Sequence, residues 1–193
     1  MKTLKTALII MALCAAAAYG QTEDLGMGAF ANSKGAIKLA VDASLVDLDL
    51  KSPYVMFVVY MAAGSDNQNI VVSRDGVTML YKGQEYKMPS LHELRKSYNG
   101  EIHDVTFYRN LAKAGLISSW IKLYEFPRKQ DFFPPLTPHA AAAVDQGSMS
   151  SFVGFRTKCY FKNPGFEKGD KLTIRVVAKN NPNLTGEVEV TLE

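Results

Sequence analysis

Three histidines are the side chains in this sequence best suited to catalysis or metal binding, and none of them has a recognised spacing. His92 begins the stretch HELRK, which matches the zinc-protease pattern H-E-x-x-H only in its first two positions. Lys96 stands where the second metal-binding histidine is needed, one helical turn later. The sequence therefore predicts no metal site and no cofactor site, and we interpret His92 as a surface residue of a helix.

Other catalytic patterns are incomplete. Ser119 and Lys122 form the S-x-x-K of the penicillin-recognising serine enzymes, but the accompanying S-D-N and K-T-G elements are absent. The sequence also has no glycine-rich phosphate loop and no G-x-S-x-G turn. We therefore expect a protein that is not an enzyme.

A secreted hydrolase or carbohydrate-active enzyme of an unfamiliar type is the alternative. In that interpretation His103 or His139 lies beside a carboxylate such as Asp104 or Asp145. General acid–base chemistry needs the pair within hydrogen-bond reach, in a closed pocket. A flat or knobbed surface would instead favour a binding protein.

The strongest candidate for partner binding is the loop at residues 128–150, which has no strand pattern and contains three prolines. Loops of this length are uncommon in compact domains and are usually functional or disordered. Phe132, Phe133, Pro134 and Pro135 form a stiff apolar cluster of the kind that anchors a partner at low entropic cost, and His139 follows in the same loop. The alternative is that both rings fold back and plug the open end of the domain.

A second candidate surface lies on the apolar run PYVMFVVYMAA, residues 53–63. Both faces of this strand are apolar, so it is either a central strand covered on both sides or a strand with one face against a partner. Tyr54, Met56 and Tyr60 lie on the face in question. A short helix predicted over residues 91–98 is available as a cover.

Two segments near the C-terminus show the alternation of apolar and polar residues that is typical of half-buried strands, LTIRVVAKN at 172–180 and EVEVTLE at 187–193. A turn-rich link joins them, so we expect an antiparallel hairpin with basic residues opposite glutamates. In FRTKCYFKN, residues 155–163, the same alternation directs Cys159 inward. We interpret Cys159 as a core residue, with intermolecular pairing and a reactive thiol as the alternatives.

The remaining elements are expected from the same patterns. Strands are predicted at 37–50 with a bulge or kink near Ala43-Ser44, in hairpins over 70–81 and 80–88, and at 102–111 and 117–126. Asp75-Gly76 is the predicted turn of the first hairpin, and Ser90 with Glu93 forms the capping box of the helix. The pattern predicts an all-β, mainly antiparallel, immunoglobulin-like β-sandwich of about eight or nine strands with one short helix.

The N-terminus matches a secretion signal at residues 1–20. Lys2 and Lys5 precede an apolar run that ends at Ala18, and small residues suited to cleavage follow. The run is shorter than the roughly 20 apolar residues that span a bilayer, so we expect no transmembrane segment after signal removal. An envelope lipoprotein anchored at Cys14 is the alternative, although the preceding Leu13 is bulkier than usual for such a site.

Signal removal leaves a chain close to neutral, because two of the 22 basic residues leave and 19 acidic residues remain. Near-neutrality argues against a nucleic-acid partner. We expect a flexible N-terminal segment at 21–34 and a single β-sandwich domain at 35–193. The predicted function is a periplasmic or secreted, non-catalytic binding or assembly module that contacts another protein or a cell-envelope component.

The export interpretation predicts a mature protein that begins at Gln21. Intact-mass measurement of the exported protein should give the mass of residues 21–193, with or without cyclisation of Gln21. An acylated chain that starts at Cys14 would contradict this and establish the lipoprotein alternative.

Overall fold

The computed structural model describes residues 22–65, 69–98, 100–110, 117, 120, 124–127, 130–134 and 142–193. The predicted signal at residues 1–20, with Cys14, lies outside the described residues, as do Ser119, Lys122, Pro135 and His139. The described chain is mainly antiparallel β structure with few helices.

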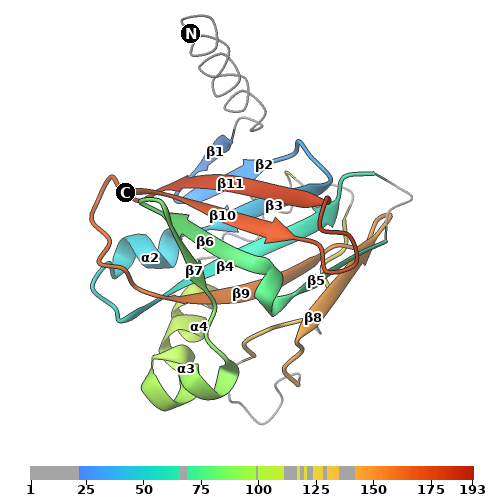
Figure 1. Ribbon diagram of the computed structural model, residues 1–193. Helices are drawn as coiled ribbons and strands as arrows, with labels where there is room; N and C mark the ends of the chain where they lie inside the picture. The colour runs from blue at the N-terminus through green and yellow to red at the C-terminus, as the bar shows by residue number, and fades with distance from the viewer. Residues whose placement is uncertain are drawn as a thin grey trace, which may run out of the picture.

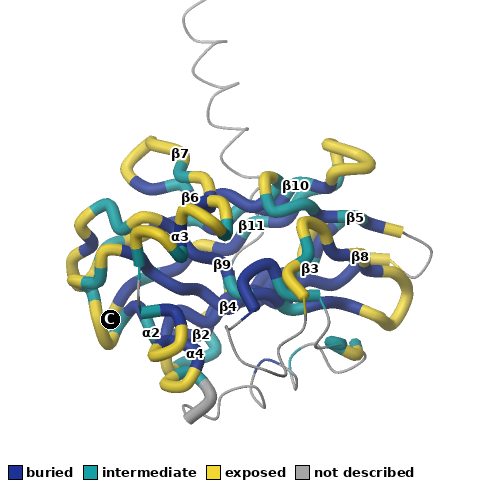
Figure 2. The backbone as a smooth tube through the Cα atoms, turned by 90° about the horizontal axis from the view of Figure 1, so that it is seen from below, coloured by how far each residue is buried: buried dark blue, intermediate teal, exposed yellow. Residues whose placement is uncertain are grey.

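The largest sheet has five antiparallel strands in the order β1-β2-β3-β4-β9. Its strands are β1 (Glu23–Gly26), β2 (Ala29–Asn32), β3 (Ile37–Asp42), β4 (Tyr54–Ala63) and β9 (Phe155–Lys162). Strand β4 pairs with β3 on one side and with β9 on the other, and all 10 of its residues are buried. Figure 2 shows β4 and β9 as buried strands among more exposed turns.

A four-stranded sheet of order β11-β10-β6-β7 packs against the first through contacts of β11 with β2 and β3. Its strands are β6 (Val77–Tyr81), β7 (Gln84–Lys87), β10 (Lys171–Val177) and β11 (Thr185–Thr191). Strands β5 (Asn69–Ser73) and β8 (Gln146–Ser150) form a separate antiparallel pair. Figure 1 shows the two larger sheets one over the other, with α3 and α4 below them in that view.

The described helices are α2 (Ser44–Leu48), α3 (Leu91–Ser97) and α4 (Glu101–Asn110), with a 3₁₀ turn at Arg74–Gly76. Within the described residues, no helix has both the length and the apolar character that crossing a membrane requires. Of the capping box predicted for α3, the Ser90 cap is confirmed, because the Ser90 side chain accepts a hydrogen bond of 3.1 Å from the backbone N–H of Glu93.

The described residues form 11 strands in three sheets, more than the eight or nine expected. The mainly antiparallel β class is confirmed. The immunoglobulin-like arrangement is not, because β1 to β4 follow one another as neighbours in a single sheet, whereas an immunoglobulin domain divides consecutive strands between ABED and CFG sheets.

The C-terminal hairpin is confirmed by the antiparallel pairing of β10 with β11. Arg175 lies directly opposite Glu187, with 3.2 Å between Nε and Oε1. Lys171 reaches Glu189 diagonally, with 3.0 Å between Nζ and Oε1. The inward apolar residues of these strands complete the core against the first sheet.

Of the two hairpins predicted between residues 70 and 88, one is confirmed and one is wrong. Strands β6 and β7 pair through a two-residue turn in which Lys82 and Gly83 both have positive φ, 47° and 79°, as a type I′ turn requires. Strand β5 instead pairs with β8, so the 3₁₀ turn carries the chain from one sheet to another. Local turn residues predicted the strands but not their partners.

Four other expectations are corrected. Helices α4 and α2 lie within the segments 102–111 and 37–50, where strands were expected. Strand β8 lies within the predicted loop, at residues 146–150. Strands β1 and β2 lie within the predicted flexible segment, at residues 23–26 and 29–32. The kink near Ala43-Ser44 is real, but it starts α2, where the Asp42 carboxylate accepts from the Ser44 N–H. Strand β8 was missed because its buried residues are Gly147 and Met149, too few apolar side chains for a clear pattern.

The inward orientation of Cys159 is confirmed. It is buried, is not in a disulfide, and lies opposite Phe57 in the β4–β9 ladder. Burial raises the pKa of its thiol well above the usual range, with the nearby Asp131 carboxylate as a smaller cause. The thiolate needed for nucleophilic chemistry is therefore disfavoured.

We expect Cys159 to react slowly with a thiol reagent in the native protein and rapidly after unfolding. Cys159→Ala should lower the free energy of unfolding by about 1 kcal/mol through lost burial, whereas Cys159→Asp should cost far more because it buries a charge without a partner. Native labelling as fast as labelling in denaturant would contradict the core assignment.

Candidate functional site

The face of β4 that carries Tyr54, Met56 and Tyr60 is covered in the structure, and all three residues are buried. Tyr98, which follows α3, lies with its ring 5.4 Å from that of Tyr54. Tyr108 of α4 lies over the other end, with 3.4 Å between its hydroxyl and that of Tyr60. Strand β4 is therefore a central strand that is covered on both faces, and the face with Tyr54, Met56 and Tyr60 is not open to a partner.

The cover is incomplete between α2 and α4, where a partly open cleft of about 120 Å³ reaches the start of β4. We call this the α2–α4 cleft. Its apolar wall consists of Leu45, Val46, Leu48, Val55, Met56 and Phe107. Its polar lining consists of Asp49, Ser52, Tyr54, Tyr98, His103 and Asp104.

Asp104 is the most buried charged residue of this lining, with 8% of its surface exposed. The Tyr98 hydroxyl donates to its Oδ2 at 2.9 Å and lies 3.2 Å from the Ser52 hydroxyl. Burial raises the pKa of Asp104, and the facing hydroxyls of Tyr98 and Tyr160 offset part of that effect. The buried Tyr160 hydroxyl lies near Asp104 but has no partner of hydrogen-bond geometry among the described residues.

His103 lies at the rim of the cleft with a side chain that is 78% exposed. Its ring stacks on Phe107 with 5.8 Å between centroids. The distance from its Nδ1 to Oδ1 of Asp104 is 3.9 Å, beyond hydrogen-bond reach. The two residues are adjacent on one helix, and this geometry is not that of a catalytic dyad.

Of the other residues considered for catalysis, those that the structure describes do not join this cleft. Asp145 forms an ion pair with Arg74, with 2.7 Å between Oδ1 and a guanidinium nitrogen. His139 lies outside the described residues, and His92 is exposed on α3. In the part of the chain that the structure describes, no group of three or more His, Cys, Asp or Glu side chains is placed to hold a metal ion.

Helix α4 has an unusual distribution of side chains, because it buries carboxylates and exposes large apolar groups. Glu101 and Asp104 are buried in its first turn, while Ile102 and Phe107 are 51% and 40% exposed. Burial raises the pKa of Glu101, and Arg95 of α3, 3.6 Å away, opposes the shift. The inner face of α4 is therefore held largely by polar contacts.

This helix was missed in the sequence although signals for it are present. Its inward residues are the buried Glu101, Asp104 and Val105 and the half-buried Tyr108. They follow helical spacing, but two of the four are acidic and so do not register as an apolar pattern. Acidic residues in a first turn are favourable at the positive end of the helix dipole.

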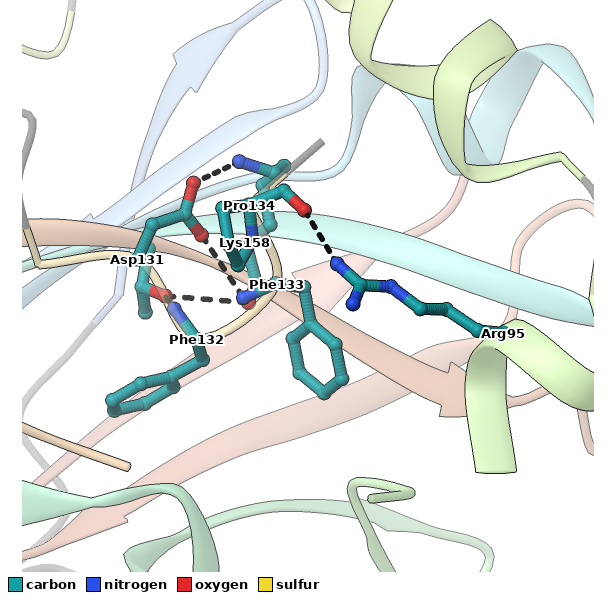
Figure 3. Close-up of polar contacts among 7 residues, drawn as sticks. Arg95, Asp131, Phe132, Phe133, Pro134 and Lys158 are labelled. Atoms are coloured by element: carbon teal, nitrogen blue, oxygen red, sulfur yellow. Dashed lines mark hydrogen bonds and ion pairs between the residues drawn. The ribbon is translucent and has the colours of Figure 1, made fainter. Parts of the chain in front are cut away.

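Residues 130–134 do not form an exposed apolar knob. Phe132, Phe133 and Pro134 are all buried, and Figure 3 shows both rings pointing to the same side, away from the ion pair of Asp131 with Lys158. The Phe132 N–H donates to Thr157 Oγ1 at 2.9 Å, which ties the segment to β9. Arg95 donates to the Pro134 carbonyl at 3.3 Å, which ties it to α3.

The two phenylalanines close the edge of the first sheet beside β9. The Phe132 ring lies 6.0 Å from Phe155 and the Phe133 ring lies 5.4 Å from Tyr160, in edge-to-face pairs. The Arg74 guanidinium lies over the Phe133 ring at 5.2 Å. Both rings are therefore plugs of the domain, which is the alternative stated for them above. Their position beside β9 also helps to cover this edge strand, which limits pairing of its backbone with another chain.

Comparison of the chain with protein-family models, with curated proteins and with solved structures finds no match.

Because both rings are buried, we expect Phe132→Ala and Phe133→Ala each to lower the free energy of unfolding by about 3 to 5 kcal/mol. Phe152→Ala is the matched control: this ring is 56% exposed, so its loss should change stability by no more than about 0.5 kcal/mol. Denaturant unfolding measures all three. A Phe132→Ala variant as stable as the parent would place the ring outside the core and restore its role as an exposed anchor.

Proposed function

We propose that the protein is an exported, periplasmic or secreted, non-catalytic binding or assembly module that contacts another protein or a cell-envelope component. The contact surface in this proposal is the outer face of α4 with the end of α2, made up of Leu48, Ile102, His103 and Phe107. We call it the α2–α4 face.

The observation that carries the proposal is the exposure of apolar side chains on α4 opposite its buried carboxylates. A helix that only packs on its own domain places apolar residues inside and charged residues outside. The helix dipole accounts for acidic residues in the first turn, but it gives no reason to expose Ile102 and Phe107. Contact with a partner would explain their exposure, because it removes that apolar surface from water.

The neighbouring helix supports the same surface. Leu48 at the end of α2 is 59% exposed, and it lines the α2–α4 cleft together with Phe107. Apolar side chains from two separate elements therefore meet around one depression. Protein interfaces commonly combine such an apolar centre with a polar rim, which His103 and Asp49 provide here.

The hydrolase alternative receives less support from the geometry. His103 and Asp104 are separated by more than a hydrogen bond, and Tyr98 donates to the carboxylate instead. Export remains inferred from the N-terminal sequence, and an anchor at Cys14 would also be compatible with a partner in the envelope.

The double variant Leu48→Ser, Phe107→Ser tests the contact surface. Both side chains are exposed, so the variant should fold and melt close to the parent temperature. We expect its affinity for a partner, identified by crosslinking the parent protein in its native envelope, to fall by about tenfold, which is about 1.4 kcal/mol. Biolayer interferometry with the purified pair measures the change.

Phe152→Ser, Val153→Ser is the matched control, because these residues are 56% and 40% exposed on a turn outside the α2–α4 face. The control should bind as the parent does. If it loses affinity while the Leu48→Ser, Phe107→Ser variant does not, the contact surface is the turn and not α4.

A further inference from the structure

The α2–α4 cleft is lined by more carboxylates than basic groups, so its lining has an excess of negative charge. Two carboxylates, Asp49 and Asp104, line it, and His103 is the sole basic residue among the described residues of the lining. The imidazole is exposed and lies 3.9 Å from the Asp104 carboxylate. An ionised carboxylate that is mostly buried favours a cation at its open side, because water solvates it poorly there.

The walls of the cleft select the kind of cation. Tyr54 and Tyr98 lie with ring centroids 5.4 Å apart, Phe107 lies on the opposite helix, and Met56 lines the apolar wall. An ammonium ion is compact and strongly hydrated, whereas a guanidinium ion is planar, weakly hydrated and stacks on aromatic rings. Aromatic walls around a carboxylate therefore suit guanidinium better than ammonium.

The size of the cleft limits the occupant to one side-chain end group. At about 120 Å³ it is smaller than the roughly 300 Å³ at which pockets for whole small molecules begin. Leu48 and Phe107 at the rim are placed to contact whatever lies beside that group. Charge, wall chemistry and size agree on the end of an arginine side chain that projects from a larger partner.

We propose that the α2–α4 cleft binds the guanidinium group of an arginine in an apolar segment of a partner protein, with Asp104 as its counter-ion. The biological role of this site rests on the function proposed above, in which the surrounding face contacts a partner. The Asp104 carboxylate accepts from the guanidinium, the aromatic side chains stack on it, and the exposed apolar residues contact its neighbours in the partner segment.

This assignment gives the site a definite pH dependence. The groups that face Asp104 are Tyr98 after α3, Tyr160 of β9, His103 of α4 and Asp49 after α2. Guanidinium binding needs the ionised carboxylate, so affinity is present above the pKa of Asp104 and is lost as the pH falls through it.

Butylguanidinium and butylurea are suitable probes, because they have nearly the same shape and only the first carries a charge. Titration of the full mature chain followed by amide chemical shifts should give saturable changes at residues 45–56 and 98–107 with butylguanidinium. Butylurea should bind about tenfold more weakly or not at all. Equal binding of the two probes, or shifts confined to other regions, would overturn the proposal.

Asp104→Asn removes the charge and keeps an oxygen that can accept from Tyr98. It should weaken butylguanidinium binding by about tenfold and abolish the pH dependence, while His103→Gln should retain most of that dependence. Asp75→Asn, which removes an exposed carboxylate outside the cleft, is the matched control and should bind as the parent does. Unchanged binding by Asp104→Asn would also overturn the proposal.

Two further comparisons keep the outcomes distinct. If Asp104→Asn does not fold, the difference between butylguanidinium and butylurea on the parent protein decides the question. If neither probe binds but Leu48→Ser, Phe107→Ser still weakens the partner complex, the guanidinium site fails and the proposed function stands. If the probes bind as expected and the partner complex is unaffected, the site exists but the proposed contact surface is wrong.

Discussion

The structure depends on keeping both faces of strand β4 away from water. Its 10 residues are buried on both sides, so one sheet face cannot be left open as it is in many antiparallel sheets. The four-stranded sheet covers one face. The other face is covered by α2, by Tyr98 after α3, by α4 and by the plug at residues 130–134. The cover assembled from these pieces leaves the α2–α4 cleft at the start of β4.

The chemistry of the covered face explains why the cover is polar. Tyr54, Tyr60 and Tyr160 each bring a hydroxyl to this face, and a buried hydroxyl without a partner is costly. The Tyr54 hydroxyl is hydrogen-bonded to the Ser97 hydroxyl at 3.0 Å, and the Tyr60 hydroxyl to the Tyr108 hydroxyl at 3.4 Å. Asp104 lies towards Tyr160. Because Tyr108 and Asp104 both belong to α4, this helix carries polar groups inward. Its apolar residues are then free to face outward, which is the arrangement found on α4.

Much of the β structure could be predicted from the sequence, because period-two alternation depends only on local residues. This applies to the C-terminal hairpin, the inward Cys159 and the β6–β7 turn. Strand partners could not be predicted in the same way: β5 pairs with β8 over 70 residues away, and nothing in the Asp75-Gly76 turn encodes that choice. Helix α4 was missed for a different reason: Glu101 and Asp104 are buried while Ile102 and Phe107 are exposed, which breaks the apolar pattern that reveals a helix.

The placement of the candidate site shows the same division between local and long-range information. Phe132-Phe133-Pro134 has the composition of a binding loop, yet Thr157 and Lys158, about 25 residues further along the chain, hold it against β9. Leu48 and Phe107 come from segments that the sequence predicted as strands, and they gather at one cleft only because α2 and α4 both cover β4. An apolar cluster in a sequence can therefore be either a buried part of the domain or a surface that contacts a partner, and the sequence alone does not distinguish the two. Apolar side chains that remain exposed after both faces of the central strand are covered carry more information, because the stability of the domain does not require them.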